Sequence, residues 1–187
     1  MREDFNNEEF QESEGQKMSS IKHSLTQTRL ATLLSNDEKL TTFVELSLDA
    51  SQIDLSQFGI KAKDELIPNV CVYLEPPFEP DDEVDDDALK ISQMPDLVIE
   101  VLSPKQTINE LLNKFKAYFA LGVKSCWLAV PSMEAIKVYS PGNQYRTFSF
   151  DSHEMIDEVM NIRLPIVEVF QKKLRKCSKN IVPNTPK

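Results

Sequence analysis

The sequence predicts a single α/β domain in which a central mixed β-sheet is flanked by helices. Its 187 residues are the length of one ordinary domain. Hydrophobic residues make up 41% of the chain, which is enough for a core that needs no disulfide or metal to stabilise it. Short apolar runs that begin or end at proline alternate with longer segments of helical period, and this alternation indicates the α/β class.

The N-terminal part of the chain is predicted to hold a disordered arm, a helix and a strand. Residues 1–17 are acidic and nearly free of large apolar side chains, so the folded domain is expected over 18–176. Apolar residues at mostly helical spacing predict a helix over 20–34, and β-formers predict a strand over 40–48. Residues 54–65 are a polar connection.

Two apolar strands and the most clearly marked helix come next. The strands are predicted over 68–74 and 95–102, and each opens at a proline. A helix over 107–121 carries one apolar stripe, and Thr107 and Glu110 have the spacing of a capping box at its start.

The rest of the chain predicts three more strands and a last helix. The strands are expected over 124–130, 135–140 and 145–150, with a proline-glycine-asparagine turn that makes the last two a hairpin. The last helix is expected over 165–176. The predicted order is therefore helix, three strands, helix, strand and hairpin.

The net charge of −9 is concentrated in two segments. Residues 1–16 carry a net −5, and residues 75–87, within a proline-rich acidic loop over 75–90, carry a net −8. The remainder is net positive and includes a basic flexible tail over 177–187. The acidic composition therefore does not exclude DNA as a partner, although it excludes a broad basic face.

The three cysteines predict reduced thiols in a cytoplasmic protein. Cys71, Cys126 and Cys177 form no C-x-x-C pair, and Cys71 and Cys126 lie in apolar strands where buried thiols are common. No run approaches the ~18 apolar residues of a membrane span, so no membrane partner is expected.

Glu100 is the first candidate functional residue. It is a carboxylate in the middle of an otherwise apolar strand, where burying an unpaired charge is unfavourable. Period-two geometry places Glu100 on the same face as Asp96, Val98 and Leu102, and Leu97, Ile99 and Val101 on the other. A metal ion or a lysine could compensate its charge, and either would make the position a site. The alternative is that Glu100 lies on an edge strand and reaches water.

Asn69 and Lys114 are the residues that could join Glu100. Asn69 begins the preceding strand, and neighbouring strands are ~4.8 Å apart, so one cation could reach both side chains. Lys114 lies at the border of the apolar stripe of helix 107–121, from which its ammonium could reach the sheet. An ordinary solvated lysine is the alternative. Asp96 is ~13 Å along the strand from Glu100, too far to share one ion with it.

The stretch over 95–131, PDLVIEVLSPKQTINELLNKFKAYFALGVKSCWLAVP, resembles the central block of the Uma-two family of bacterial restriction endonucleases, in the PD-(D/E)XK nuclease superfamily. That block has the pattern P-D-L-V-x-E-V-L-S-P, then an acidic residue and a lysine on a helix with a following tyrosine, then G-V-x-x-Y-W-L-V. The segment 68–70 is similar to the family's preceding P-D-V strand, and the resemblance covers most of 20–172. It implies a restriction-endonuclease-like fold.

The resemblance also implies a metal site. Such nucleases hold a metal ion between an Asp and a Glu on adjacent strands, with a lysine near the attacking water. Carried over to this chain, Glu100 is the Glu ligand, Lys114 is the lysine on the helix, and Asn69 stands at the Asp position. The superfamily's usual lysine position falls here on Leu102, which is apolar.

Supporting positions of the motif fall on Asp96, Glu110 and Tyr118. Asn69 is the main departure, because an amide oxygen can contact Mg²⁺ but brings no charge to offset its dehydration. Weak binding of Mg²⁺ or Mn²⁺ is therefore expected.

The implied function is metal-dependent hydrolysis of DNA phosphodiester bonds, by a protein that resembles restriction enzymes in forming a homodimer. The alternative that Asn69 favours is a catalytically inactive nuclease fold that acts in DNA binding or protein assembly. A purely structural interaction protein is a third reading, and it would leave Glu100 without a cation.

Overall fold

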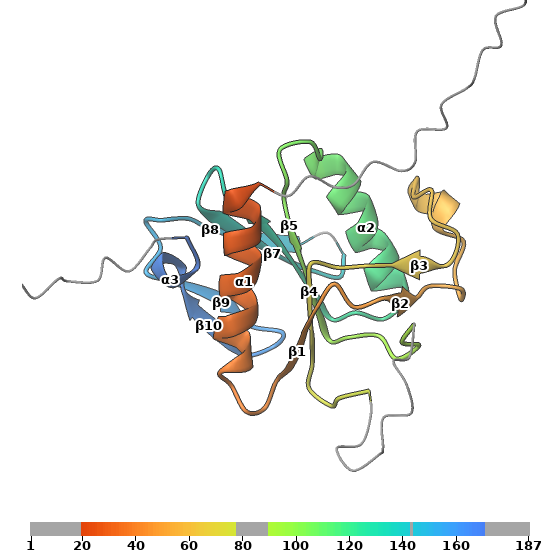
Figure 1. Cartoon of the computed structure of the whole chain (residues 1–187), viewed down its shortest axis with the longest axis horizontal. Coiled ribbons are helices and arrows are strands. Elements are labelled where there is room, and N and C mark those ends of the chain that lie inside the picture. Colours follow the sequence, from red (N-terminus) through yellow and green to blue (C-terminus); the bar gives the residue numbers. More distant parts are fainter. Residues whose placement is uncertain (1–19, 78–89, 143, 171–187) are drawn as a thin grey trace, which may run out of the picture.

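The computed structural model describes residues 20–77, 90–142 and 144–170 (Figure 1). A six-stranded mixed sheet has the strand order β1-β4-β5-β6-β7-β8, and two small two-stranded ribbons, β2–β3 and β9–β10, lie outside it. The helices and strands are α1 (Ile21–Ser35), β1 (Thr41–Val44), β2 (Leu48–Asp49), the 3-10 helix η1 (Leu55–Phe58), β3 (Glu65–Leu66), β4 (Val70–Tyr73), β5 (Leu97–Val101), α2 (Ile108–Ala120), β6 (Ser125–Val130), β7 (Ala135–Ser140), β8 (Gln144–Phe148), β9 (Glu154–Asp157), β10 (Ile162–Pro165) and α3 (Ile166–Phe170).

The central sheet is antiparallel except for the pair β5 and β6. These two strands run parallel because α2 connects them as a crossover, which parallel neighbours require. Helix α2 begins as predicted: the Thr107 hydroxyl accepts from the Glu110 backbone N–H at 3.3 Å, and the Glu110 carboxylate accepts from the Thr107 N–H at 2.9 Å. Its connection back to the sheet sets α2 over one face of β5 and β6.

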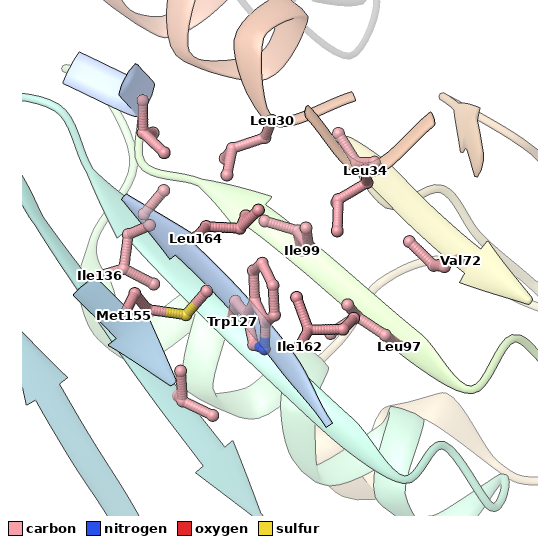
Figure 2. Close-up of a cluster of buried hydrophobic side chains, with 14 of the residues drawn as sticks. Leu30, Leu34, Val72, Leu97, Ile99, Trp127, Ile136, Met155, Ile162 and Leu164 are labelled. Carbon is pink, nitrogen blue, oxygen red and sulfur yellow. The ribbon is translucent and has the colours of Figure 1, made fainter. Parts of the chain in front are cut away.

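The sheet separates two hydrophobic clusters. On one face α1, α3 and the β9–β10 ribbon pack in a cluster around Trp127, which Figure 2 shows among Ile99, Ile162 and Leu164. On the other face α2, η1 and the β2–β3 ribbon form the second cluster. Helices α1 and α2 therefore lie on opposite sides of the sheet (Figure 1). The alternation predicted for β5 is confirmed, since Leu97 and Ile99 face the first cluster and Val98 faces the second.

The prediction of one strand over 40–48 is wrong. Strand β1 ends at Val44, because Glu45 adopts a left-handed backbone conformation with φ of 53° that a continuing strand does not allow. The chain then leaves the central sheet, and β2 pairs instead with β3. The predicted polar connection over 54–65 contains η1 and the first residue of β3.

The ribbon of β9 and β10, whose strands have four residues each, was not predicted. The last helix begins near the predicted residue, and it is described only as far as Phe170. The predicted arm over 1–17, most of the acidic loop and the tail over 177–187 lie outside the described residues. In the described part of the chain, no helix is long and apolar enough to cross a bilayer.

Candidate active site

Glu100 lies in the middle of the buried sheet, on the face that α2 covers. Only 1% of the residue is exposed to solvent, and its neighbours along β5 are buried apolar side chains. Because β4 and β6 flank β5, Glu100 is not on an edge strand and does not reach water in the way an edge carboxylate would. Its charge must therefore be compensated within the protein.

Two side chains of α2 supply that compensation. The Lys114 ammonium contacts Glu100 Oε1 directly, and the Tyr118 hydroxyl donates a hydrogen bond to the same oxygen at 3.1 Å. Lys114 and Tyr118 are four residues apart, so one helical turn presents both to the sheet. Lys114 Nζ also donates to the backbone carbonyl of Ile67 at 3.2 Å, which ties the helix to the segment before β4.

Asn69 lies next to this cluster, at the start of β4. Val70 pairs with Ile99 in the antiparallel register, and continuing that register by one residue places Asn69 opposite Glu100. The Asn69 side-chain oxygen accepts a hydrogen bond from the Val101 backbone N–H at 2.8 Å. The amide is thus beside Glu100, but its oxygen is bound to the backbone of β5.

The backbone of Asn69 is held by α1, on the opposite face of the sheet, and by the residue that follows β1. Its carbonyl accepts from the side-chain amide of Gln27 on α1 at 3.2 Å and from the Glu45 backbone N–H at 3.3 Å. The same Gln27 nitrogen donates to the Glu45 carboxylate at 3.2 Å. Helix α1 and the left-handed residue after β1 therefore fix the position of Asn69.

The two other supporting residues of the sequence prediction lie away from Glu100. Asp96 immediately precedes the first residue of β5, whereas Glu100 is next to the last. The Asp96 carboxylate accepts from the Leu74 backbone N–H at 2.7 Å and pairs with Lys124 at 2.7 Å. Glu110 is the acid of the capping box. Both have structural contacts that account for their positions. Tyr118 is the supporting residue that contacts the cluster.

Burial changes the acid–base properties of the groups around Glu100. Burial and the neighbouring negative charge of Glu100 hold the pKa of Tyr118 well above its usual value. Burial likewise raises the pKa of Cys126 well above that of a free thiol, and raises the pKa of Cys71 to about 12. Tyr118 is therefore a hydrogen-bond donor at neutral pH and not a base. Cys71 and Cys126 are free thiols that are buried, as predicted, and they are neutral at that pH.

The side chains at this site offer few ligands for a divalent ion. It offers one carboxylate, Glu100, and one amide oxygen, Asn69, and among the described residues no three His, Cys, Asp or Glu side chains form a group that could hold a metal ion. Mg²⁺ often keeps several waters and takes one or two protein carboxylates together with substrate phosphates. Glu100 and Asn69 are compatible with that type of binding, and not with a complete protein cage.

A second buried carboxylate, Asp157 of β9, was missed by the sequence analysis. It is fully buried, and four donors surround it. Oδ2 accepts from the Ser125 hydroxyl and the Trp127 indole N–H, both at 2.6 Å, and Oδ1 accepts from the backbone N–H groups of Val159 and Met160 at 2.9 and 3.1 Å. These contacts satisfy the carboxylate without a cation, so Asp157 has a structural role in joining the β9–β10 ribbon to the sheet.

Comparison with known proteins identifies the type of protein that carries this cluster. The sequence model of the Uma2 (Uma-two) family, described as "Putative restriction endonuclease", matches residues 6–166. A solved structure from Anabaena variabilis, described as a "putative nuclease belonging to DUF820", is similar with a TM-score of 0.62 and 20% sequence identity, over 82% of this chain and 82% of that chain. No curated protein matches the chain. The structural likeness shows a shared fold, and the family match spans most of the sequence. The chain belongs to the Uma2 family and shares the fold of the Anabaena variabilis protein.

Proposed function

We propose that this protein is a metal-dependent DNA endonuclease that hydrolyses phosphodiester bonds, with Asn69 limiting its activity. The observation that carries the proposal is the buried carboxylate of Glu100, with Lys114 and Tyr118 on one of its oxygens and Asn69 opposite it. A purely structural role does not explain why a charged pair is placed in the middle of an apolar sheet, where two apolar side chains would pack at lower cost.

Glu100 and Asn69 are the residues that would hold the ion. A bound Mg²⁺ or Mn²⁺ supplies Lewis-acid polarisation of the phosphate and lowers the pKa of a bound water. Lys114 is the protein's own cation at the site: its side chain is 14% exposed, whereas that of Glu100 is 2% exposed. Its ammonium can therefore meet solvent or substrate while it stays paired with Glu100. In this position Lys114 can orient the attacking water and stabilise negative charge that develops on the phosphate. Tyr118 positions Glu100 by donating to Oε1.

Asn69 is expected to make the wild type a poor enzyme. A neutral amide contributes no charge to offset dehydration of a hard divalent ion. Mn²⁺ should support activity better than Mg²⁺, because it tolerates imperfect ligand sets. Asn69→Asp restores the missing charge next to Glu100.

The experiment is a divalent-ion titration of the wild type, Asn69→Asp and Glu100→Ala with supercoiled, linear duplex and single-stranded DNA as substrates. Metal binding and cleavage should increase in Asn69→Asp and disappear in Glu100→Ala. Glu110→Gln is the matched control, because glutamine keeps the capping box of α2 while a carboxylate away from Glu100 is removed. If Asn69→Asp cleaves none of these substrates with either metal, the endonuclease proposal fails. Cleavage that survives Glu100→Ala would place the chemistry elsewhere.

A second candidate is a catalytically inactive nuclease fold that binds DNA or assembles with other proteins. It is favoured by the contacts already made at the site: the Asn69 oxygen is bound to the Val101 N–H, and Lys114 neutralises Glu100. On this reading the cluster needs no metal. DNA binding by the wild type in EDTA, together with an inactive Asn69→Asp variant, would support it. Homodimer formation is proposed under either function and can be checked by analytical ultracentrifugation.

A further inference from the structure

A groove lies on the same face of the sheet as Glu100 but along the other side of α2. It is a hollow of about 350 Å³ between α2 and the hairpin of β7 and β8. One stripe of α2, which includes Ile108 and Lys116, forms its first wall, and Lys137, Tyr139 and Tyr145 form the second. Lys114 and Tyr118 point from the opposite border of the helix to Glu100, so α2 separates the groove from the candidate active site.

Three aromatic rings lead from the core to the surface of this groove. The ring centroids of Phe115 and Tyr139 are 5.4 Å apart, and those of Tyr139 and Tyr145 are 5.2 Å apart with an interplanar angle of 33°. Phe115 and Tyr139 are buried, whereas Tyr145 is 57% exposed. Tyr139, itself packed against Phe115, contacts the Tyr145 ring. The exposed part of the Tyr145 ring is an aromatic surface that solvent and ligands can reach.

The groove is positively charged in a chain whose net charge is −9. Lys116 on α2 is exposed, and Lys137 on β7 places its ammonium 5.2 Å from the centroid of the Tyr145 ring. None of the described residues that line the groove is acidic. Two lysines and an exposed aromatic ring in one groove, without a counter-charge among the described lining residues, are complementary to an anionic and partly aromatic ligand.

We propose that this groove binds a single-stranded segment of nucleic acid, with a base stacked on Tyr145 and phosphates at Lys116 and Lys137. Proteins that bind single strands combine aromatic platforms with a positively charged path for the backbone. A duplex does not offer the same contact, because its bases are stacked on one another. The inference rests on the proposed function only for the choice of nucleic acid as the partner.

The register of the sheet relates the groove to the candidate active site. Lys137 pairs with Leu128, and Leu128 pairs with Glu100, so Lys137 and Glu100 are two strand spacings apart, about 10 Å between their backbones. Because α2 lies between them, a strand held in the groove reaches Glu100 only by passing around that helix. The groove would select substrates that have a single-stranded segment.

The test measures binding and not cleavage. The full chain is titrated into a fluorescein-labelled single-stranded oligothymidine, and into a duplex of the same length, in EDTA, and fluorescence anisotropy is followed. The single strand should bind more tightly than the duplex. Tyr145→Ala should weaken single-strand binding about 5- to 150-fold, whereas Tyr145→Phe should keep most of it. Lys137→Ala should lower the slope of log affinity against log salt by about 0.7.

Lys39→Ala is the matched control, because Lys39 is an exposed lysine in the connection between α1 and β1, outside the groove. Equal or tighter binding of the duplex would overturn the inference. So would a loss of affinity in Tyr145→Ala no larger than that in Lys39→Ala. Because the assay contains no free metal, its failure is distinguishable from failure of the endonuclease proposal. Glu100→Ala should retain single-strand binding even though cleavage is lost.

Discussion

Replacing Lys114 by methionine tests whether the buried charge of Glu100 is held by this lysine. The substitution keeps most of the apolar stem of the side chain and removes the ammonium. Glu100, of which 1% is exposed, then keeps the Tyr118 hydroxyl but loses its charged partner. The buried carboxylate would remain in an apolar sheet with one hydrogen bond.

The expected cost follows from the burial of the pair. Two unit charges at 4 Å attract by about 4 kcal/mol at an effective dielectric constant of 20. Removing one member of a buried pair typically costs about 3–5 kcal/mol, because the other charge stays desolvated. Lys114→Met should therefore lower the free energy of unfolding by about 3–5 kcal/mol. For a domain of this size the melting temperature should fall by about 6–20 °C.

Substitution of the other member of the ion pair, Glu100, and the double variant separate the effect of the charge from that of the packing. Glu100→Gln should cost less, about 1–3 kcal/mol, because Lys114 is 14% exposed and still donates to the Ile67 carbonyl. The double variant Glu100→Gln with Lys114→Met should recover most of the stability lost in Lys114→Met, since no buried charge remains.

Urea unfolding followed by tryptophan fluorescence is a suitable assay. Trp127 is the single tryptophan of the chain, and it is fully buried on β6, next to β5. Lys124→Met is the control, because Lys124 pairs with Asp96 near the other end of β5 but is 56% exposed. That exposed pair should change stability by less than about 1 kcal/mol. The reasoning is refuted if Lys114→Met is as stable as Lys124→Met, or if the double variant is no more stable than Lys114→Met.

Three further predictions concern other parts of the molecule. Asp157→Asn should lower the free energy of unfolding by about 2–5 kcal/mol, because an amide group cannot accept from all four donors, and urea unfolding measures this. Cys71 and Cys126 should not react with a thiol reagent at pH 8 until the protein unfolds: burial raises the pKa of Cys71 to about 12, so its reactive thiolate forms only near that pH. Unfolding in urea should expose both thiols together. Deletion of residues 79–87 should shift the melting temperature by less than about 5 °C, since consecutive like charges contribute no core, and calorimetry would reveal a larger drop.

The local features of the candidate site could be predicted from the sequence. The alternation along β5 assigned Glu100 to the face of Val98, and the structure confirms that α2 covers this face. The capping box at Thr107 and the apolar stripe set the start and the orientation of α2. Both depend on residues a few positions apart, whose period and spacing are properties of the chain itself.

The tertiary structure alone decided which group compensates Glu100. The sequence left a metal, a lysine or water open, and the choice depends on how α2 docks on a sheet that residues far apart in the chain build together. The same holds for Asn69, whose side-chain oxygen is bound to the Val101 N–H, 32 residues away. Asp157 was missed because its side-chain donors, Ser125 and Trp127, are 32 and 30 residues away. A buried polar group is stabilised by its partners in space, and the sequence pattern near it does not record them.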